Sequence, residues 1–206
     1  MYQLYYSPNA CSLATQVVLH ELGHEVEIID KRGVTHFNEI SATGAVPALK
    51  TNDTVLLEGA AIMINMLEKQ TTPMFPQGVA ERTQAIEDIM FANATMHPAY
   101  SKLFFISSLD IDDTAKIIAL NAAADGVSSL WSIVEQRLHG QDFLGGDHYS
   151  AADIMLTVYS RWNQLHSVDI LMGERTRNLL GAISNLTSFQ RAIANETKHS
   201  AAYEVL

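Results

Sequence analysis

Apolar residues recur with two different periods in the first part of this chain, up to about residues 70–78, and with one period after it. Before that point, short stretches of alternating apolar residues are typical of β-strands. They are separated by stretches with apolar residues three or four positions apart, which are typical of helices. These patterns predict strands over residues 2–6, 25–30, 47–51 and 54–57, and helices over residues 10–22, 36–42 and 60–68.

Residues 70–78 contain two prolines, two threonines and one glycine, a composition typical of a linker. Beyond this segment, strand patterns nearly vanish, and helical spacing predicts helices over residues 80–107, 112–139, 151–166, 173–184 and 188–198. A βαβ unit followed by a β-hairpin and a helix, with a cysteine after the first strand, is the arrangement of thioredoxin-like domains. We therefore expect an α/β plus all-α protein. A thioredoxin-like βαβ-α-ββα domain would span residues 1–76, and an all-helical domain would span residues 80–206.

Composition and charge exclude several classes of protein. The chain has 13 basic and 23 acidic side chains, for a formal net charge of −10. Binding to nucleic acid or to an anionic membrane needs clustered Lys and Arg, so neither partner is expected. No apolar run approaches the length of a membrane span, and no secretory signal is visible. A single cysteine cannot form an internal disulfide, so we expect a cytoplasmic protein.

Cys11, the only cysteine, follows the first predicted strand and a turn at Ser7-Pro8-Asn9. This position is the first turn of a helix, where free backbone N–H groups and the helix dipole favour a thiolate. A free thiol has a pKa of ~8.5, which such a site lowers. A lone cysteine is ordinarily a small buried hydrophobe, but the turn favours a partly exposed, reactive thiol. Dithiol redox proteins carry a second cysteine three residues later, where this chain has Ala14.

Two other segments of the first domain could contact a ligand. In thioredoxin-like domains, a proline that opens a strand after a loop is cis and faces the cysteine, and Pro47 holds this position. Val46 would then offer its backbone N–H and C=O to a peptide-like ligand. Glu58 precedes a helix, where its carboxylate either stabilises the helix dipole or, with the N–H groups of Gly59 and Ala60, binds an amino acid head group. The local sequence favours neither function over the other.

In the second domain, the segment around Ser150 has the pattern of a capping box. Ser150 is expected to cap a helix, and Asp153, three residues later, to accept a hydrogen bond from the Ser150 N–H. Tyr149 and Ile154 fit the hydrophobic staple that often accompanies this motif. We interpret the segment as a folding signal that carries no chemistry.

Together these segments resemble the glutathione S-transferase family, most closely its bacterial beta class, over nearly the whole chain. The segment around Cys11 is specific to that class, whereas those around Pro47, Glu58 and Asp153 are shared across the superfamily. The resemblance implies a homodimeric detoxification enzyme that uses glutathione as a substrate together with a small apolar electrophile, and that needs no metal.

The resemblance also implies roles for individual residues. The catalytic residues would be Cys11, Ser12 and His97. Glutathione would be bound by Cys11, Val46, Pro47, Glu58 and Gly59, with Glu58 contacting the γ-glutamyl group. The electrophile pocket would be lined by Met90, Asn93, His97, Tyr100 and Trp162. Judged by its local sequence alone, His97 would be an ordinary solvated or core histidine.

The chain departs from the beta-class pattern at four places, and each departure removes a polar contact to glutathione. Ser41-Ala42-Thr43-Gly44 replaces an Asn-Pro-Lys-Gly segment, and Pro98 replaces a lysine after the histidine. Met90 replaces an asparagine that reaches across the dimer, and the segment over residues 30–35 is shorter than usual.

The leading interpretation is a glutathione transferase, in which the glutathione thiolate attacks an electrophilic small molecule. Two alternatives stay open. The first is a glutathione-dependent disulfide reductase or lyase that forms a mixed disulfide with Cys11. The second is a non-catalytic module with the same fold that carries a ligand or binds a partner.

Overall fold

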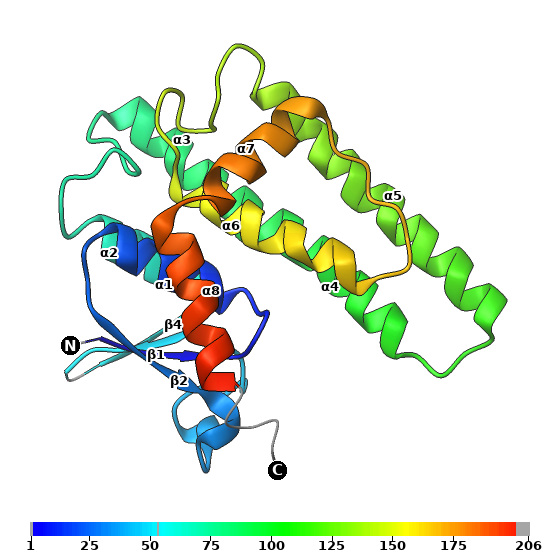
Figure 1. The fold of residues 1–206 in the computed structure, drawn as a ribbon, viewed down its shortest axis with the longest axis horizontal. Coiled ribbons are helices and arrows are strands. Elements are labelled where there is room, and N and C mark those ends of the chain that lie inside the picture. The colour runs from blue at the N-terminus through cyan, green and yellow to red at the C-terminus, as the bar shows by residue number, and fades with distance from the viewer. Residues whose placement is uncertain (1, 53, 201–206) are drawn as a thin grey trace. The chain divides into compact units, whose positions relative to one another are not determined.

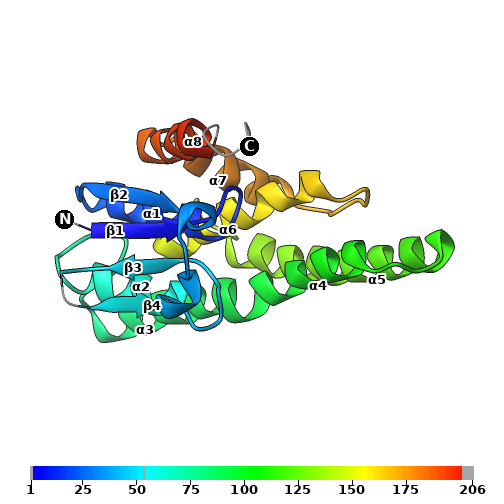
Figure 2. The same ribbon diagram turned by 90° about the horizontal axis from the view of Figure 1, so that it is seen from below.

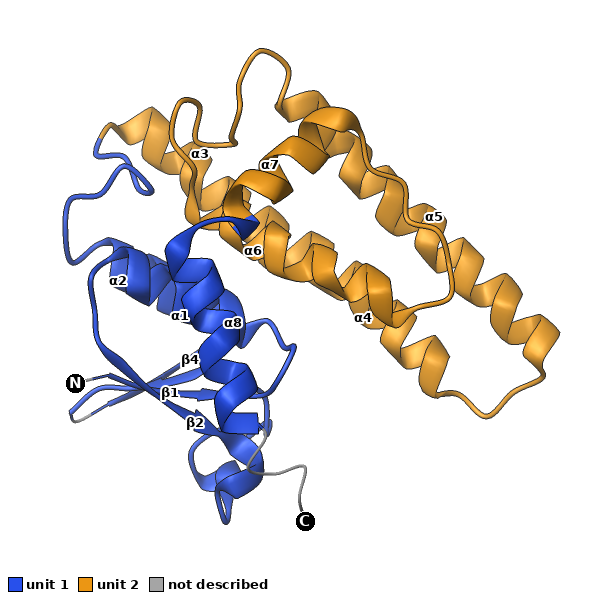
Figure 3. Ribbon diagram, in the orientation of Figure 1, with its two compact units in different colours: residues 1–77, 184–206 blue, residues 78–183 orange. Residues whose placement is uncertain are grey.

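The computed structural model describes residues 2–52 and 54–200 and divides into two compact units. Unit 1 comprises residues 1–77 and 184–206, and unit 2 comprises residues 78–183 (Figure 3).

Unit 1 is built on a four-stranded mixed sheet with the strand order β2-β1-β3-β4, which can be followed in Figure 2. The strands are β1 (Tyr2–Tyr6), β2 (Val26–Asp30), β3 (Ala48–Lys50) and β4 (Val55–Leu57). Strand β1 is parallel to β2 and antiparallel to β3, and β3 is antiparallel to β4. All four predicted strands are present, and the thioredoxin-like arrangement is confirmed.

Two helices cover the same side of this sheet, α1 (Ser12–Glu21) and α2 (Gly59–Leu67) (Figure 1). Helix α1 ends where the sequence predicts, because Gly23 adopts a φ of +74° and lets His24 N donate to Leu19 O at 2.9 Å. The short helix expected over residues 36–42 is instead a single 3₁₀ turn, η2 (Phe37–Glu39). Another 3₁₀ turn, η1 (Lys31–Gly33), lies before it and was not predicted.

The last helix, α8 (Thr187–Ser200), belongs to unit 1 and contacts α1 and β2. Its side chains Phe189, Ala192 and Glu196 are buried, and a Glu196 carboxylate oxygen accepts a hydrogen bond from the backbone N–H of Asn9 at 3.4 Å. The prediction of one helical domain over residues 80–206 is therefore wrong at its C-terminal end. The apolar face of α8 completes the core of the sheet-containing unit.

Unit 2 is helical throughout its regular structure. Its elements are α3 (Val79–Met90), η3 (Phe91–Met96), α4 (His97–Ser108), α5 (Asp113–Arg137), α6 (Ala151–Ser160), η4 (Arg161–Leu165) and α7 (Glu174–Ser184). Helix α6 packs against α3 and η3, and all its residues from Ala151 to Tyr159 are buried. The α4 and α5 helices form an antiparallel pair (Figure 1).

By length and composition, α5 could cross a membrane, so the expectation that no apolar run approaches that length is wrong. In the structure, 22% of the apolar window of α5 is buried, and the buried residues of the helix are Ala124, Val127, Trp131 and Val134. These residues are three or four positions apart, which places them on one side of the helix. This side of the helix therefore packs inside unit 2.

The capping box of α6 is confirmed by its hydrogen bonds. Ser150 N donates to an Asp153 carboxylate oxygen at 2.7 Å, and Asp153 N donates to Ser150 Oγ at 3.3 Å. The other Asp153 oxygen accepts from Leu144 N at 3.1 Å, so the carboxylate also fixes the preceding loop.

Candidate functional site

The thiol of Cys11 lies beside the backbone of the residue before the proline. Cys11 is the residue immediately before α1, and its Sγ donates to the Val46 carbonyl oxygen at 3.5 Å. The Val46–Pro47 peptide bond is cis, as the sequence predicts. The Ser7-Pro8-Asn9 turn allows this approach, because Asn9 adopts a φ of +59°, which asparagine tolerates better than most residues. Unit 1 thus places a thiol next to a backbone edge that can bind a peptide.

The prediction that the Cys11 pKa is lowered is wrong. Burial raises the pKa of the Cys11 thiol to about 11, and the Glu58 carboxylate also raises it. The backbone N–H groups of Cys11 and Ser12 lower the pKa, as a helix N-terminus should, but their effect is smaller than the loss of hydration. At neutral pH this group is a thiol that donates a hydrogen bond.

We expect the alkylation rate of Cys11 to rise with pH through a midpoint well above ~8.5, the value for free cysteine, because only the thiolate reacts. Iodoacetamide labelling followed by mass spectrometry measures this profile. Glu58→Gln should lower the midpoint, since it removes a negative charge that disfavours the thiolate. A midpoint at or below that of free cysteine would contradict the raised pKa.

Glu58 has an unusual backbone conformation at the start of α2. Its φ is +66° and its ψ is 114°, a combination that side-chain-bearing residues rarely adopt. Its carboxylate makes no capping hydrogen bond to the helix, and the side chain is exposed. Strained residues cluster at ligand sites because the surrounding structure holds them there. This geometry favours the ligand-binding interpretation of Glu58 over the helix-dipole one, and Gly59 contributes the first N–H of the helix.

The loop before Pro47 is ordered without the lysine of the beta-class pattern. The Ser41 hydroxyl donates to the Ala45 carbonyl at 3.0 Å, and Thr43 Oγ1 accepts from Ala45 N at 3.3 Å. Lys31 Nζ donates to the Gly44 carbonyl at 3.0 Å. Sequence analysis missed Lys31, which brings a cation to this loop from η1. Lys31 and Gly44 are thirteen residues apart in the sequence, so no local sequence pattern links them.

Ser12, a predicted catalytic residue, is fully buried in the structure. Its hydroxyl oxygen accepts a hydrogen bond from Ser7 N at 3.4 Å, so the hydroxyl faces the turn that precedes α1. This placement gives Ser12 a part in holding the turn.

His97 is the first residue of α4 and contacts an aromatic cluster within unit 2. The centroid of its ring lies 5.2 Å from that of Tyr159 and 5.3 Å from that of Trp162, both edge-to-face. Pro98 follows it, and because proline lacks an N–H and clashes with the preceding turn, the regular α-helical ladder is interrupted here. The residues before His97 form the π-helical segment η3, which contains Asn93.

The structure places two members of the expected electrophile pocket inside the helical core. Tyr100 is fully buried, and its hydroxyl donates to Asn163 Oδ1 at 2.6 Å and accepts from Trp131 Nε1 at 2.8 Å. Trp162 is also buried, with 5% of its surface exposed. These two side chains support the aromatic cluster from within the helical core. Met90 is exposed at the end of α3.

Two residues that sequence analysis missed extend the same cluster toward the surface. Phe104 lies 5.6 Å from Trp162 and 4.7 Å from His166, measured between ring centroids. Phe104 is 39% exposed. Its position four residues after Tyr100 in a helix is a signal that could have identified it. His166 follows η4 and has no comparable pattern.

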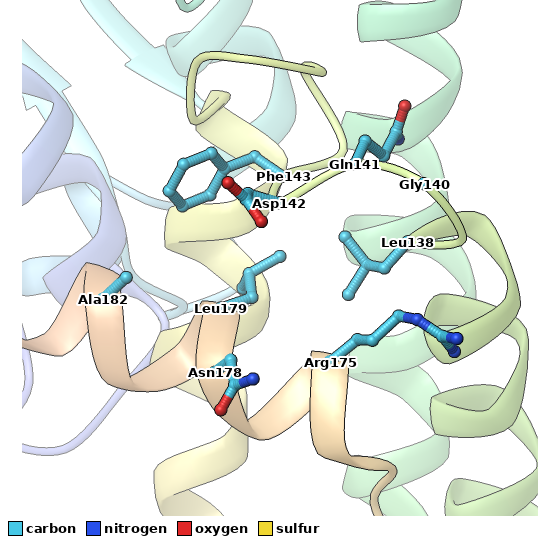
Figure 4. Close-up of a pocket in the computed structure, with 9 residues that line it drawn as sticks. All are labelled: Leu138, Gly140, Gln141, Asp142, Phe143, Arg175, Asn178, Leu179 and Ala182. Atoms are coloured by element: carbon cyan, nitrogen blue, oxygen red, sulfur yellow. The ribbon is translucent and has the colours of Figure 1, made fainter.

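A separate cavity of about 440 Å³ lies in unit 2 (Figure 4). Leu138 and Leu179 line its apolar part, between the loop after α5 and helix α7. Arg175 is at its edge, and its guanidinium pairs with the Glu135 carboxylate at 3.3 Å. None of the residues expected from the sequence to bind glutathione or the electrophile lines this cavity. Among the described residues, no group of three or more His, Cys, Asp or Glu could hold a metal ion.

Three comparisons with known proteins bear on the identity of the chain. No family model matches it. It is 30% identical over 163 residues to glutathione S-transferase D7 of Drosophila melanogaster, and the match covers 74% of this chain and 70% of that protein. The chain therefore belongs to the glutathione S-transferase family. Among solved structures, a beta-class glutathione S-transferase of Sphingomonas chungbukensis is 26% identical, with a TM-score of 0.80 over 94% of this chain and 98% of that one.

A sphingomonad glutathione S-transferase, solved in complex with glutathione, is also 26% identical. Its TM-score is 0.82, and the match covers 95% of this chain and 98% of that one. The family, the resemblance to the beta class and the two-part fold expected from the sequence are thus confirmed. The prediction of a glutathione transferase enzyme is confirmed at the level of this family.

Proposed function

We propose that this glutathione S-transferase binds glutathione in unit 1 and attaches it, through its sulfur, to a small apolar electrophile. The single observation that supports this most strongly is the approach of Cys11 Sγ to the Val46 carbonyl beside the cis peptide bond. A peptide thiol bound to the backbone of Val46 would place its sulfur next to Cys11. Glu58 would bind the γ-glutamyl ammonium, and the N–H groups of Gly59 and Ala60 its carboxylate.

In this proposal the protein lowers the pKa of the glutathione thiol and positions two substrates. When glutathione binds, Cys11 turns its single S–H from the Val46 carbonyl to the glutathione sulfur, and its raised pKa keeps that proton in place. His97 accepts the thiol proton, and the aromatic cluster that includes Phe104 contacts the electrophile. Lys31 offers a cation to the glycyl carboxylate, in place of the lysine missing from the loop over residues 41–44.

The raised pKa also separates conjugation from the disulfide reductase alternative. A mixed disulfide requires Cys11 as a thiolate, and the thiol form is a poor nucleophile. Conjugation uses the sulfur of glutathione itself and needs no thiolate at Cys11. The electrostatics of Cys11 therefore favour the transferase.

Calorimetry with millimolar glutathione, together with turnover assays on an aromatic electrophile and on a small disulfide, tests the proposal. We expect glutathione binding and conjugation in the unmodified protein, and conjugation that survives in Cys11→Ala. Loss of all turnover in Cys11→Ala would favour the mixed-disulfide mechanism. No binding and no turnover of either substrate would leave only a carrier or interaction module with this fold.

We also propose that the enzyme is a cytoplasmic homodimer that acts in detoxification. Strand β4 is an edge of the sheet and exposes Val55 and Leu57, each 38% exposed, which is a pattern typical of surfaces that pair with another chain. Sedimentation analysis of the unmodified protein and of Leu57→Glu would test this: a dimer should dissociate in the variant, and a monomer in both would contradict it.

A further inference from the structure

The imidazole ring of His97 is contacted on several sides within unit 2. Besides the edge-to-face contacts with Tyr159 and Trp162, its Nδ1 lies 3.5 Å from the hydroxyl oxygen of Ser101. Ser101 is one helical turn later in α4, and residues four positions apart in a helix face the same side. The ring therefore has a polar neighbour at one nitrogen and aromatic neighbours around it.

The hydroxyl proton of Ser101 is already engaged within the helix. Ser101 Oγ lies 3.1 Å from the backbone carbonyl oxygen of His97, closer than it lies to Nδ1. A carbonyl oxygen can only accept, so the single hydroxyl proton of Ser101 is donated to it. The lone pairs of Oγ remain, and they can only accept a hydrogen bond from Nδ1–H.

We propose that Ser101 is a positioning residue that holds neutral His97 in the tautomer with its proton on Nδ1. The hydrogen bond made by one ring nitrogen determines which nitrogen carries the proton. The lone pair is then on Nε2, on the opposite side of the ring. Burial lowers the pKa of His97, so the ring is neutral at neutral pH and its tautomer decides what each nitrogen can do.

This inference rests on the proposed function, in which His97 accepts the proton of the glutathione thiol. With the lone pair on Nε2, the S–H bond can break while an Nε2–H bond forms, and the electron pair stays on sulfur as the thiolate. In the other tautomer Nε2 carries a proton and can only donate. Ser101 thus acts on the reaction through His97, without touching the substrate.

The tautomer can be measured directly by NMR on protein labelled with ¹⁵N at its histidine side chains. Two-bond ¹H–¹⁵N spectra, recorded where His97 is neutral, separate Nδ1–H from Nε2–H, and the His97 signals are assigned by their loss in His97→Gln. We expect the unmodified protein to favour Nδ1–H. In Ser101→Ala the ratio should move toward Nε2–H by roughly 2- to 3-fold, the lower end for one neutral hydrogen bond, because the 3.5 Å contact is longer than an ordinary N–H···O bond. Ser101→Thr keeps the hydroxyl and should restore the original ratio.

Ser108→Ala is the matched control, because Ser108 is on the same helix and its hydroxyl donates only to the Phe105 carbonyl, at 2.7 Å. It should leave the tautomer unchanged. Ser101 is exposed, so Ser101→Ala should fold normally, and the chemical shifts of the other histidines verify this. An unchanged His97 ratio in Ser101→Ala would overturn the inference.

Turnover gives a second readout that separates this inference from the proposed function. At saturating glutathione, Ser101→Ala should lower kcat by a factor no larger than the fold-change in the tautomer ratio. The KM for glutathione should change little. Ser101→Thr should restore kcat. A tautomer shift in a protein that neither binds nor conjugates glutathione would sink the proposed function and leave the role of Ser101 standing. A fall in kcat without a tautomer shift would overturn the role of Ser101.

Discussion

Asp153→Ala is expected to lower the free energy of unfolding by roughly 2–6 kcal/mol. The Asp153 side chain is fully buried and accepts hydrogen bonds from the backbone N–H groups of Ser150 and Leu144. Removing it leaves these two buried backbone N–H groups without an acceptor, and each costs about 1–3 kcal/mol. Urea denaturation followed by circular dichroism measures this change.

Asp112→Ala is the matched control. Asp112 also caps a helix, since its carboxylate accepts from Ala115 N at 3.1 Å, but both residues are exposed. Its loss should cost about 0.5–2 kcal/mol, because water replaces the missing acceptor. Equal effects for Asp112→Ala and Asp153→Ala would mean that the capping box contributes no more than an ordinary surface cap.

The pH dependence of stability provides a separate test of Asp153. Burial raises its pKa from the ordinary value of 3.8 to about 6, against the hydrogen bonds from Ser150 and Leu144 that lower it. Because the folded state holds the proton more tightly, this group stabilises the fold fully below the unfolded pKa, and that contribution is lost as the pH rises through about 6. The free energy of unfolding of the unmodified protein, relative to that of Asp153→Asn, should therefore fall as the pH rises from 4 to 6 and then level off. A difference that stays constant over this range would show that the carboxyl is not protonated in the fold.

Glu58→Ala is expected to weaken glutathione binding by roughly 10- to 100-fold, with a smaller effect on the conjugation rate at saturating glutathione. A charge-assisted hydrogen bond to an ammonium group is worth about 1.5–3 kcal/mol, which corresponds to one to two decades in Kd. Calorimetric titration measures the affinity. Glu68→Ala, at the opposite end of α2, changes the net charge equally and should leave the affinity unchanged.

Glu58→Gly separates the binding role of this residue from its structural role. The φ of +66° at Glu58 is a strained conformation for a residue with a side chain, and glycine relieves that strain. The variant should fold with unchanged or higher stability, by up to about 2 kcal/mol, while losing glutathione affinity as Glu58→Ala does. An affinity equal to that of the unmodified protein in both variants would exclude Glu58 from the glutathione site.

Local sequence patterns predicted most of the fold because each regular element has its own apolar period and its own end signals. The strands of unit 1, the end of α1 at Gly23 and the capping box of α6 all depend on residues within a few positions of one another. The 3₁₀ turn at Lys31–Gly33 was not predicted, and the one at Phe37–Glu39 was predicted as a longer helix, because a short turn has too few residues to show a period.

For the candidate site, the sequence identified which residues carry chemistry but could not determine their surroundings. The position of Cys11 after the first strand and before a helix follows from local pattern alone. Its raised pKa does not, because burial depends on residues distant in sequence, and here the loss of hydration exceeds the effect of two N–H groups. Tyr100 illustrates the same limit, since a tyrosine on a helix face can line a pocket or, as here, be fully buried against Trp131 and Asn163.

By itself, then, the sequence determined the order of strands and helices, the family and the identity of the thiol, proline and carboxylate residues in unit 1. The tertiary structure alone decided that α8 packs with the sheet and that Lys31 reaches Gly44. The physical reason is the range of each interaction. Helical and strand periods, caps and turns are set by neighbours along the chain. Burial, pKa values and contacts between separate segments depend on how those segments pack together in space.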